Sequence, residues 1–114
     1  MAKYLLIYRN PPDPSEPPSA EEMQAVLAAW GTWIGKFSAT GNILDAGDGL
    51  LGTGKQLRAG GVVSDGPFME SKEVLGGYSV IQADSYDHAV AISKDNPIFS
   101  AGGWIEIREL AGYG

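Results

Sequence analysis

Residues 4–8 read YLLIY, a continuous apolar run of aromatic and branched side chains near the start of the chain. An apolar run without polar alternation is typical of a central strand that is buried on both faces. The other elements are therefore expected to assemble around this strand.

A proline-rich connector and a long amphipathic helix follow the strand. Residues 9–18 carry five prolines, which predicts an extended surface loop, with a lid over a site as the alternative. Ser19 and Glu22 then form a capping box that begins a helix, and Gly41 ends it. Between them, apolar residues recur at helical spacing and predict one stripe for the core: Met23, Val26, Leu27, Trp30, Ile34 and Phe37.

Small residues form a ridge beside this stripe, at Ala28, Gly31 and Gly35. Glycine costs a helix about 1 kcal/mol relative to alanine. Two glycines in one helix therefore predict close approach by another backbone.

The remaining elements complete a recognisable order. They are strands over residues 42–46, 74–83 and 104–110, a strand-like hairpin over 56–63 that is weakened by Gly60 and Gly61, and a helix over 85–94 capped by Asp84. This order is close to the ferredoxin-like β-α-β-β-α-β plan, an α+β antiparallel sheet with two helices on one face. Because two helices shield only one side of the sheet, we expect a homodimer.

Length and composition limit the class of protein. The chain has 114 residues, which predicts a single domain over residues 1–114. Its net charge of -6 and its eight scattered Lys and Arg residues argue against partners such as nucleic acid or an anionic membrane. The absence of cysteine excludes disulfides, thiolate metal sites and a Cys nucleophile. The first apolar run is short for a signal peptide or membrane span, so a cytoplasmic protein is expected.

Two apparent motifs carry little weight. Residues 47–56 match the dinucleotide fingerprint and, except at Gln56, the phosphate loop by letter. Both motifs need a following helix, and the next segment does not read as one, so a flexible glycine-rich hairpin is expected. His88 is expected to be an exposed helix residue rather than a general base, and one histidine with scattered carboxylates predicts no metal site and no cofactor.

The turn Asp65-Gly66-Pro67-Phe68 is the most specific local feature. The Asp carboxylate, the glycine and the proline favour a rigid turn, with Phe68 as a core anchor. Glu70, Lys72 and Glu73 follow it and could bind a small polar ligand or shift one another's pKa. The alternative is a structural turn beside a solvated charge cluster.

This turn, together with Glu70, Lys72-Glu73 and Gly76-Gly77-Tyr78, resembles the signature of the YCII-related proteins known as the DGPF group. The resemblance spans most of the chain, including the first strand, the segment from Gly47 to Leu50 and the last strand. It implies a dimeric α+β barrel, in which two ferredoxin-like protomers pack sheet to sheet. In the family's catalytic branch a His on the first helix pairs with an Asp near its end, whereas this chain has Ala25 and Ala39 at those positions.

Three functions stay open. The first is a homodimer that binds a small organic ligand and has no established catalysis. The third is an interaction module that regulates a transcription-related partner. The second is an enzyme, resembling muconolactone isomerase or dehydrochlorinases, on aromatic or lactone-like metabolites. Asp65 or Glu70 would be its base and Lys72 its electrostatic partner. The candidate ligand-binding residues are Tyr8, Asp65, Phe68, Glu70, Lys72 and Tyr78.

Overall fold

The first strand lies at the centre of the sheet, as predicted. A computed structural model of the chain describes residues 1–11, 19–66 and 74–113. Strand β1 (Ala2–Asn10) is flanked by β5 (Val74–Ala83) and β6 (Trp104–Glu109). Its alternate residues Tyr4, Leu6 and Tyr8 are buried, while the other face of the strand is only half-buried. The expectation of burial on both faces is therefore correct for one face, because the described elements cover only that side.

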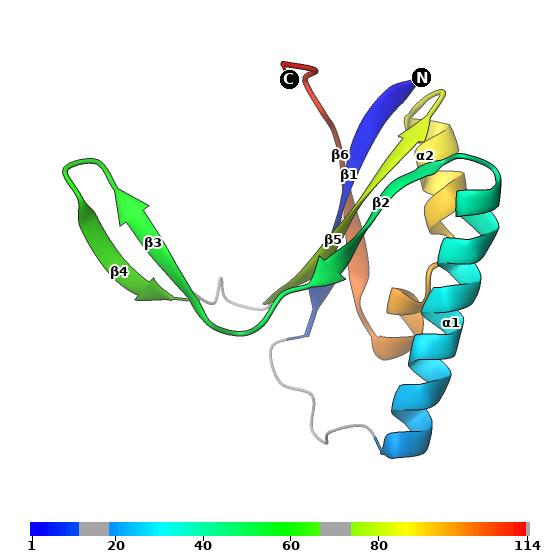
Figure 1. Cartoon of the computed structure of the whole chain (residues 1–114), viewed down its shortest axis with the longest axis horizontal. Helices are drawn as coiled ribbons and strands as arrows, with labels where there is room; N and C mark the ends of the chain where they lie inside the picture. The colour runs from blue at the N-terminus through cyan, green and yellow to red at the C-terminus, as the bar shows by residue number, and fades with distance from the viewer. Residues whose placement is uncertain (12–18, 67–73, 114) are drawn as a thin grey trace.

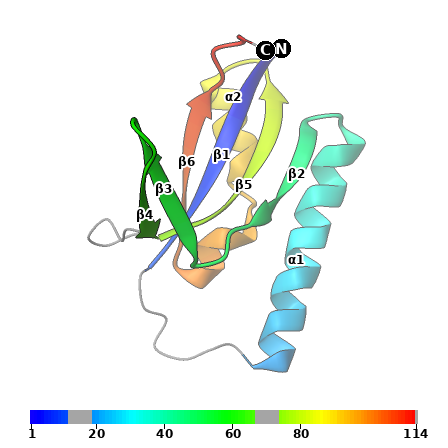
Figure 2. The same ribbon diagram turned by 60° about the vertical axis from the view of Figure 1, so that its left-hand side comes forward.

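The main sheet is antiparallel, in the order β2-β5-β1-β6. Helix α1 (Ala20–Ala39) connects β1 to β2 (Ile43–Gly49), and helix α2 (Tyr86–Ser93) connects β5 to β6. Both helices lie on one side of the sheet (Figures 1 and 2). The architecture is an α+β fold consistent with the ferredoxin-like plan.

Helix α1 begins where the sequence predicts. Ser19 is its N-cap, and the Ser19 hydroxyl accepts a hydrogen bond of 3.1 Å from the Glu22 amide. The predicted core stripe is only half correct. Its C-terminal part packs on the sheet, whereas three residues of its N-terminal part are exposed: Met23 by 43%, Val26 by 38% and Leu27 by 62%.

The most deeply buried side chain of α1 is Trp33, which the predicted stripe omitted. It is 2% exposed, and its indole N–H donates a 3.0 Å hydrogen bond to the Ile92 carbonyl. The predicted close approach at Gly31 and Gly35 is wrong among the described residues, since a Cβ at either position would meet nothing within 4 Å.

The strand-like hairpin predicted over residues 56–63 is a hairpin in the structure, with wider bounds. Strands β3 (Gly54–Arg58) and β4 (Val62–Gly66) pair only with each other in the part of the chain that the structure describes. Gly60 and Gly61 have φ of 85° and 78°, in the left-handed region that favours glycine, and they make its turn. The hairpin projects from the side of the sheet opposite the helices (Figures 1 and 2).

Helix α2 is capped by Ser85 rather than by Asp84. The Ser85 hydroxyl accepts a hydrogen bond from the His88 amide at 3.1 Å. Ala89, Ile92 and Ser93 are its buried residues, and a short 3₁₀ helix, η1 (Pro97–Ala101), follows Asn96. In the described ranges, no helix combines the length and the apolar character needed to cross a membrane.

Candidate functional site

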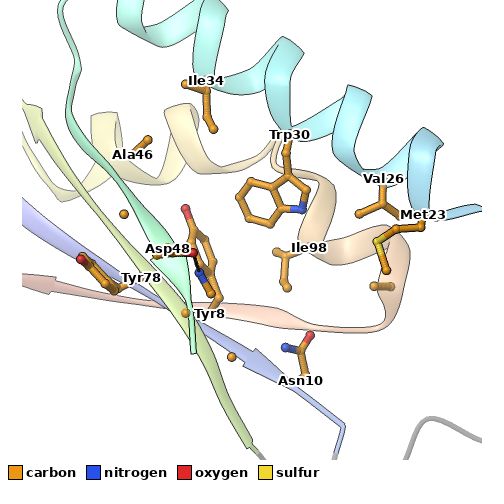
Figure 3. A pocket seen from close by; sticks show the side chains of 15 residues that line it. Tyr8, Asn10, Met23, Val26, Trp30, Ile34, Ala46, Asp48, Tyr78 and Ile98 are labelled. Carbon is orange, nitrogen blue, oxygen red and sulfur yellow. Dashed lines mark hydrogen bonds between the residues drawn. The ribbon is translucent and has the colours of Figure 1, made fainter. Parts of the chain in front are cut away.

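A cleft of about 530 Å³ opens between the N-terminal half of α1 and one end of the main sheet. This volume is in the range of small-molecule sites in proteins. Helix α1 forms one wall, η1 closes an end, and the floor comes from β1, β2 and β5 (Figure 3). The cleft therefore joins segments that are far apart in the sequence.

The helix wall of the cleft is apolar. Met23, Val26, Trp30 and Ile34 line it from successive turns of α1, and Ile98 lines it from η1. Met23 and Val26 are the part of the predicted stripe that leaves the core. Their exposure means that the first half of α1 faces the cleft and not a packed interior.

The sheet side of the cleft is built from small residues. Gly47 has a φ of 75°, and a Cβ there would collide with the Tyr78 carbonyl. A Cβ on Gly77 would lie 2.7 Å from the Asp48 carbonyl oxygen. Strands β2 and β5 can approach this closely only because both positions lack a side chain.

Tyr8 lies at the inner end of the cleft, where its ring meets Trp30 edge to face at a centroid distance of 5.0 Å. Its hydroxyl donates a 2.7 Å hydrogen bond to Ser79 Oγ, which in turn donates at 2.7 Å to the Ala46 carbonyl. The Asn96 amide donates to the Tyr8 oxygen at 3.4 Å. These hydrogen bonds fix the orientation of the Tyr8 ring, and the hydroxyl proton is already used in the bond to Ser79.

Burial raises the pKa of the Tyr8 phenol, and its contacts with Ser79 and Asn96 oppose the shift without cancelling it. The phenol is therefore neutral at physiological pH. Its oxygen retains room to accept a hydrogen bond, whereas donation to a ligand would require breaking the bond to Ser79.

Two polar residues of the cleft were not among the candidates from the sequence. Asp48 of β2 is exposed, and one of its carboxylate oxygens accepts a 2.7 Å hydrogen bond from the Gly49 amide. Asn10 ends β1 and points into the cleft towards Ile98 (Figure 3). Strand alternation from Tyr8 could have placed Asn10 on the helix side of the sheet, but not its contact with Gly76.

The structure brings together only part of the predicted site. Tyr8 and Tyr78 both border the cleft, but Tyr78 pairs with Ile7 on the side of the sheet without helices, so its ring lies away from Trp30 (Figure 3). Asp65 is on the β3–β4 hairpin, where its exposed carboxylate pairs with Lys55 at 2.7 Å. It does not line the cleft. Phe68, Glu70 and Lys72 lie outside the described residues.

The structure also shows the surroundings of the glycine-rich loop and of His88. Strand β3 follows the glycine-rich loop, so the described chain offers no helix N-terminus there to hold a phosphate. His88 lies on α2, away from the cleft, and its Nδ1 accepts a 3.0 Å hydrogen bond from the Asp84 amide. Across residues 1–11, 19–66 and 74–113, no three His, Asp or Glu side chains are placed to hold a metal ion.

Comparison with known proteins identifies the family of this chain. The chain has no significant match among curated proteins. A family model, that of the YCII-related domain, matches residues 2–111. The match covers both the cleft and the hairpin, and the chain belongs to the YCII-related domain family.

Proposed function

We propose that this protein binds a small organic molecule in the cleft beneath α1 and acts as a homodimer. The observation that carries the proposal is the exposed apolar half of α1 over a glycine floor. Met23 and Val26 are left uncovered by the described chain although they belong to the same stripe as the packed Phe37. Apolar side chains arranged over a cavity of this size are typical of ligand pockets.

The residues that line the cleft favour binding over acid–base catalysis. A general base needs a free ionisable group near the reacting atom. Tyr8 is held neutral and donates its O–H hydrogen bond to Ser79, and Asp48 lies at the exposed rim. Ala25 and Ala39 stand where the catalytic branch of the family carries its His and Asp, which also supports a binding role.

The dimeric part of the proposal is supported by the open face of the sheet. Leu5 pairs with Val80 and Ile7 with Tyr78 across β1 and β5, so four half-buried apolar residues gather on the side without helices. A one-sided antiparallel sheet usually presents polar residues to water. A second copy packed sheet to sheet would cover this surface and complete a dimeric α+β barrel.

The hairpin supports the same arrangement. An isolated two-stranded hairpin is marginally stable in water. Leu57 and Val63 face each other across β3 and β4 and are 74% and 55% exposed. Because the hairpin stands on the open side of the sheet (Figures 1 and 2), a second copy on that side can contact both surfaces.

Binding in the cleft is tested with prodan, 6-propionyl-2-dimethylaminonaphthalene, a neutral fluorophore whose emission shifts to the blue in apolar surroundings. Wild-type protein is expected to bind prodan and shift its emission. Val26→Glu places a carboxylate on the apolar wall and should weaken binding by about tenfold or more. Val90→Glu is the matched control, since Val90 lies on α2 outside the cleft and is 42% exposed, close to the 38% of Val26.

Circular dichroism of both variants confirms that they are folded. Retained binding by Val90→Glu and loss by Val26→Glu would support the cleft as the site. No emission shift with the wild-type protein, or equal binding to all three proteins, would contradict it.

A further inference from the structure

The side chain of Asn10 packs against two glycines, Gly76 and Gly103. A Cβ on Gly76 would collide with the Asn10 amide nitrogen, and a Cβ on Gly103 would lie 3.1 Å from the Asn10 amide oxygen. For Gly76, the Asn10 side chain is the nearest group. Two segments that flank β1 therefore leave room for one carboxamide at the mouth of the cleft.

The other two asparagines show what a structural role requires. Asn96 accepts a hydrogen bond from the Ile98 amide and donates to Tyr8, and Asn42 donates to the Gln82 carbonyl at 3.0 Å. Both asparagines are buried. The half-buried Asn10 side chain makes no hydrogen bond within residues 1–11, 19–66 and 74–113, and it points into the cleft (Figure 3).

The chemistry around Asn10 specifies a ligand class. A carboxamide presents an N–H donor beside a C=O acceptor, which matches the edge of another amide through two parallel hydrogen bonds. The Trp30 ring and the glycine floor suit a flat aromatic body. The Asp48 carboxylate at the rim disfavours an anion.

From this geometry we infer that Asn10 is the specificity-determining residue of the cleft, selecting a flat, neutral aromatic ligand that carries a carboxamide or lactam edge. The inference rests on the proposed function, because it assigns a ligand class to the same cleft. Asn10 binds the amide edge, Trp30 contacts the aromatic face, and Gly76 keeps the Asn10 side chain in place.

The test compares three naphthalene probes by isothermal titration calorimetry. They are 2-naphthamide, the methyl ketone 2-acetonaphthone, which has the same shape without the N–H donor, and the anion 2-naphthoate. Wild-type protein should prefer the amide over the ketone by about five- to tenfold, the contribution of one well-formed neutral hydrogen bond. It should bind 2-naphthoate most weakly.

Asn10→Leu keeps the shape of the side chain and removes its polar atoms. Its amide-to-ketone affinity ratio should fall to about one, while the ketone still binds. Gly76→Ala should reduce the ratio as well, since its methyl group displaces the Asn10 amide. Asp48→Asn should strengthen 2-naphthoate binding relative to the neutral probes.

The outcomes distinguish this inference from the proposed function. If none of the naphthalene probes nor prodan binds the wild-type protein, the cleft is not a ligand site and both proposals fail. If the probes bind but the wild-type ratio is near one, or Asn10→Leu keeps the wild-type preference, the role of Asn10 is wrong and the binding function stands.

Discussion

The Tyr8 hydroxyl donates a 2.7 Å hydrogen bond to Ser79 Oγ, joining two neighbouring strands beneath the cleft. Tyr8 is 5% exposed and Ser79 is 0% exposed. Ser79 passes the interaction on to the Ala46 carbonyl of β2, so one phenol links three strands of the sheet. This network both holds the fold and fixes the inner wall of the site.

Tyr8→Phe is expected to lower the free energy of unfolding by about 1–2 kcal/mol, because buried Ser79 and Asn96 each lose a partner. The measurement is urea denaturation followed by circular dichroism. Tyr113→Phe is the control, since Tyr113 is 99% exposed and its hydroxyl should contribute nothing measurable. A loss by Tyr8→Phe no larger than that of the control would show that the network contributes little stability.

The same residue gives a pH prediction. Burial raises the pKa of Tyr8 in the folded protein above its ordinary 10.0. Its stabilising contribution is complete below about pH 10 and is lost as pH rises through the folded pKa, because the unfolded chain releases this proton first. Stability of the wild-type protein should therefore fall more steeply above pH 10 than that of Tyr8→Phe. Tyr4, whose pKa burial also raises, is present in both proteins and cancels in the comparison, so parallel curves would contradict the prediction.

The exposed glycines of α1 offer a stabilising change. Gly31→Ala and Gly35→Ala should each raise the free energy of unfolding by about 0.5–1 kcal/mol, since alanine favours a helix and its Cβ meets no described atom within 4 Å. Thermal denaturation measures the gain. Gly47→Ala is the opposite control, because its Cβ would strike the Tyr78 carbonyl at a positive φ. A loss of stability in Gly31→Ala would reveal a partner surface on this helix face.

The sequence predicted the sheet better than the helix surfaces. Residues 74–83 are confirmed as strand β5, and Ser19 is confirmed as the cap of α1. Local patterns sufficed there, because strand alternation and capping are decided within a few residues. The strand-like hairpin predicted over residues 56–63 is also confirmed, and Gly60 and Gly61 make its turn because both have positive φ.

The site was harder to predict for a physical reason. An apolar stripe on a helix has the same sequence whether it packs on a core or lines a cleft, so Met23 and Val26 gave no sign of their exposure. The predicted stripe omits Trp33 because it includes the next residue, Ile34, instead. In the structure, the Trp33 indole reaches the Ile92 carbonyl. Asn10 required the three-dimensional relation to Gly76, which no local spacing contains.

The last prediction concerns assembly. The radius of gyration is 15.7 Å, larger than the about 13 Å expected for a compact chain of this length. The β3–β4 hairpin, which projects away from the main sheet (Figure 1), adds to this size. We expect a dimer of the 12.0 kDa chain at micromolar concentration by analytical ultracentrifugation.

Two variants locate the interface. Val80→Arg places a charge on the open face of β5 and should dissociate the dimer, since an unpaired buried charge is costly in an interface. Val90→Arg on α2 is the matched control and should remain dimeric. A wild-type monomer under these conditions would contradict the homodimer and favour a different protein as the partner of this face. A dimer unaffected by Val80→Arg would move the interface away from the sheet.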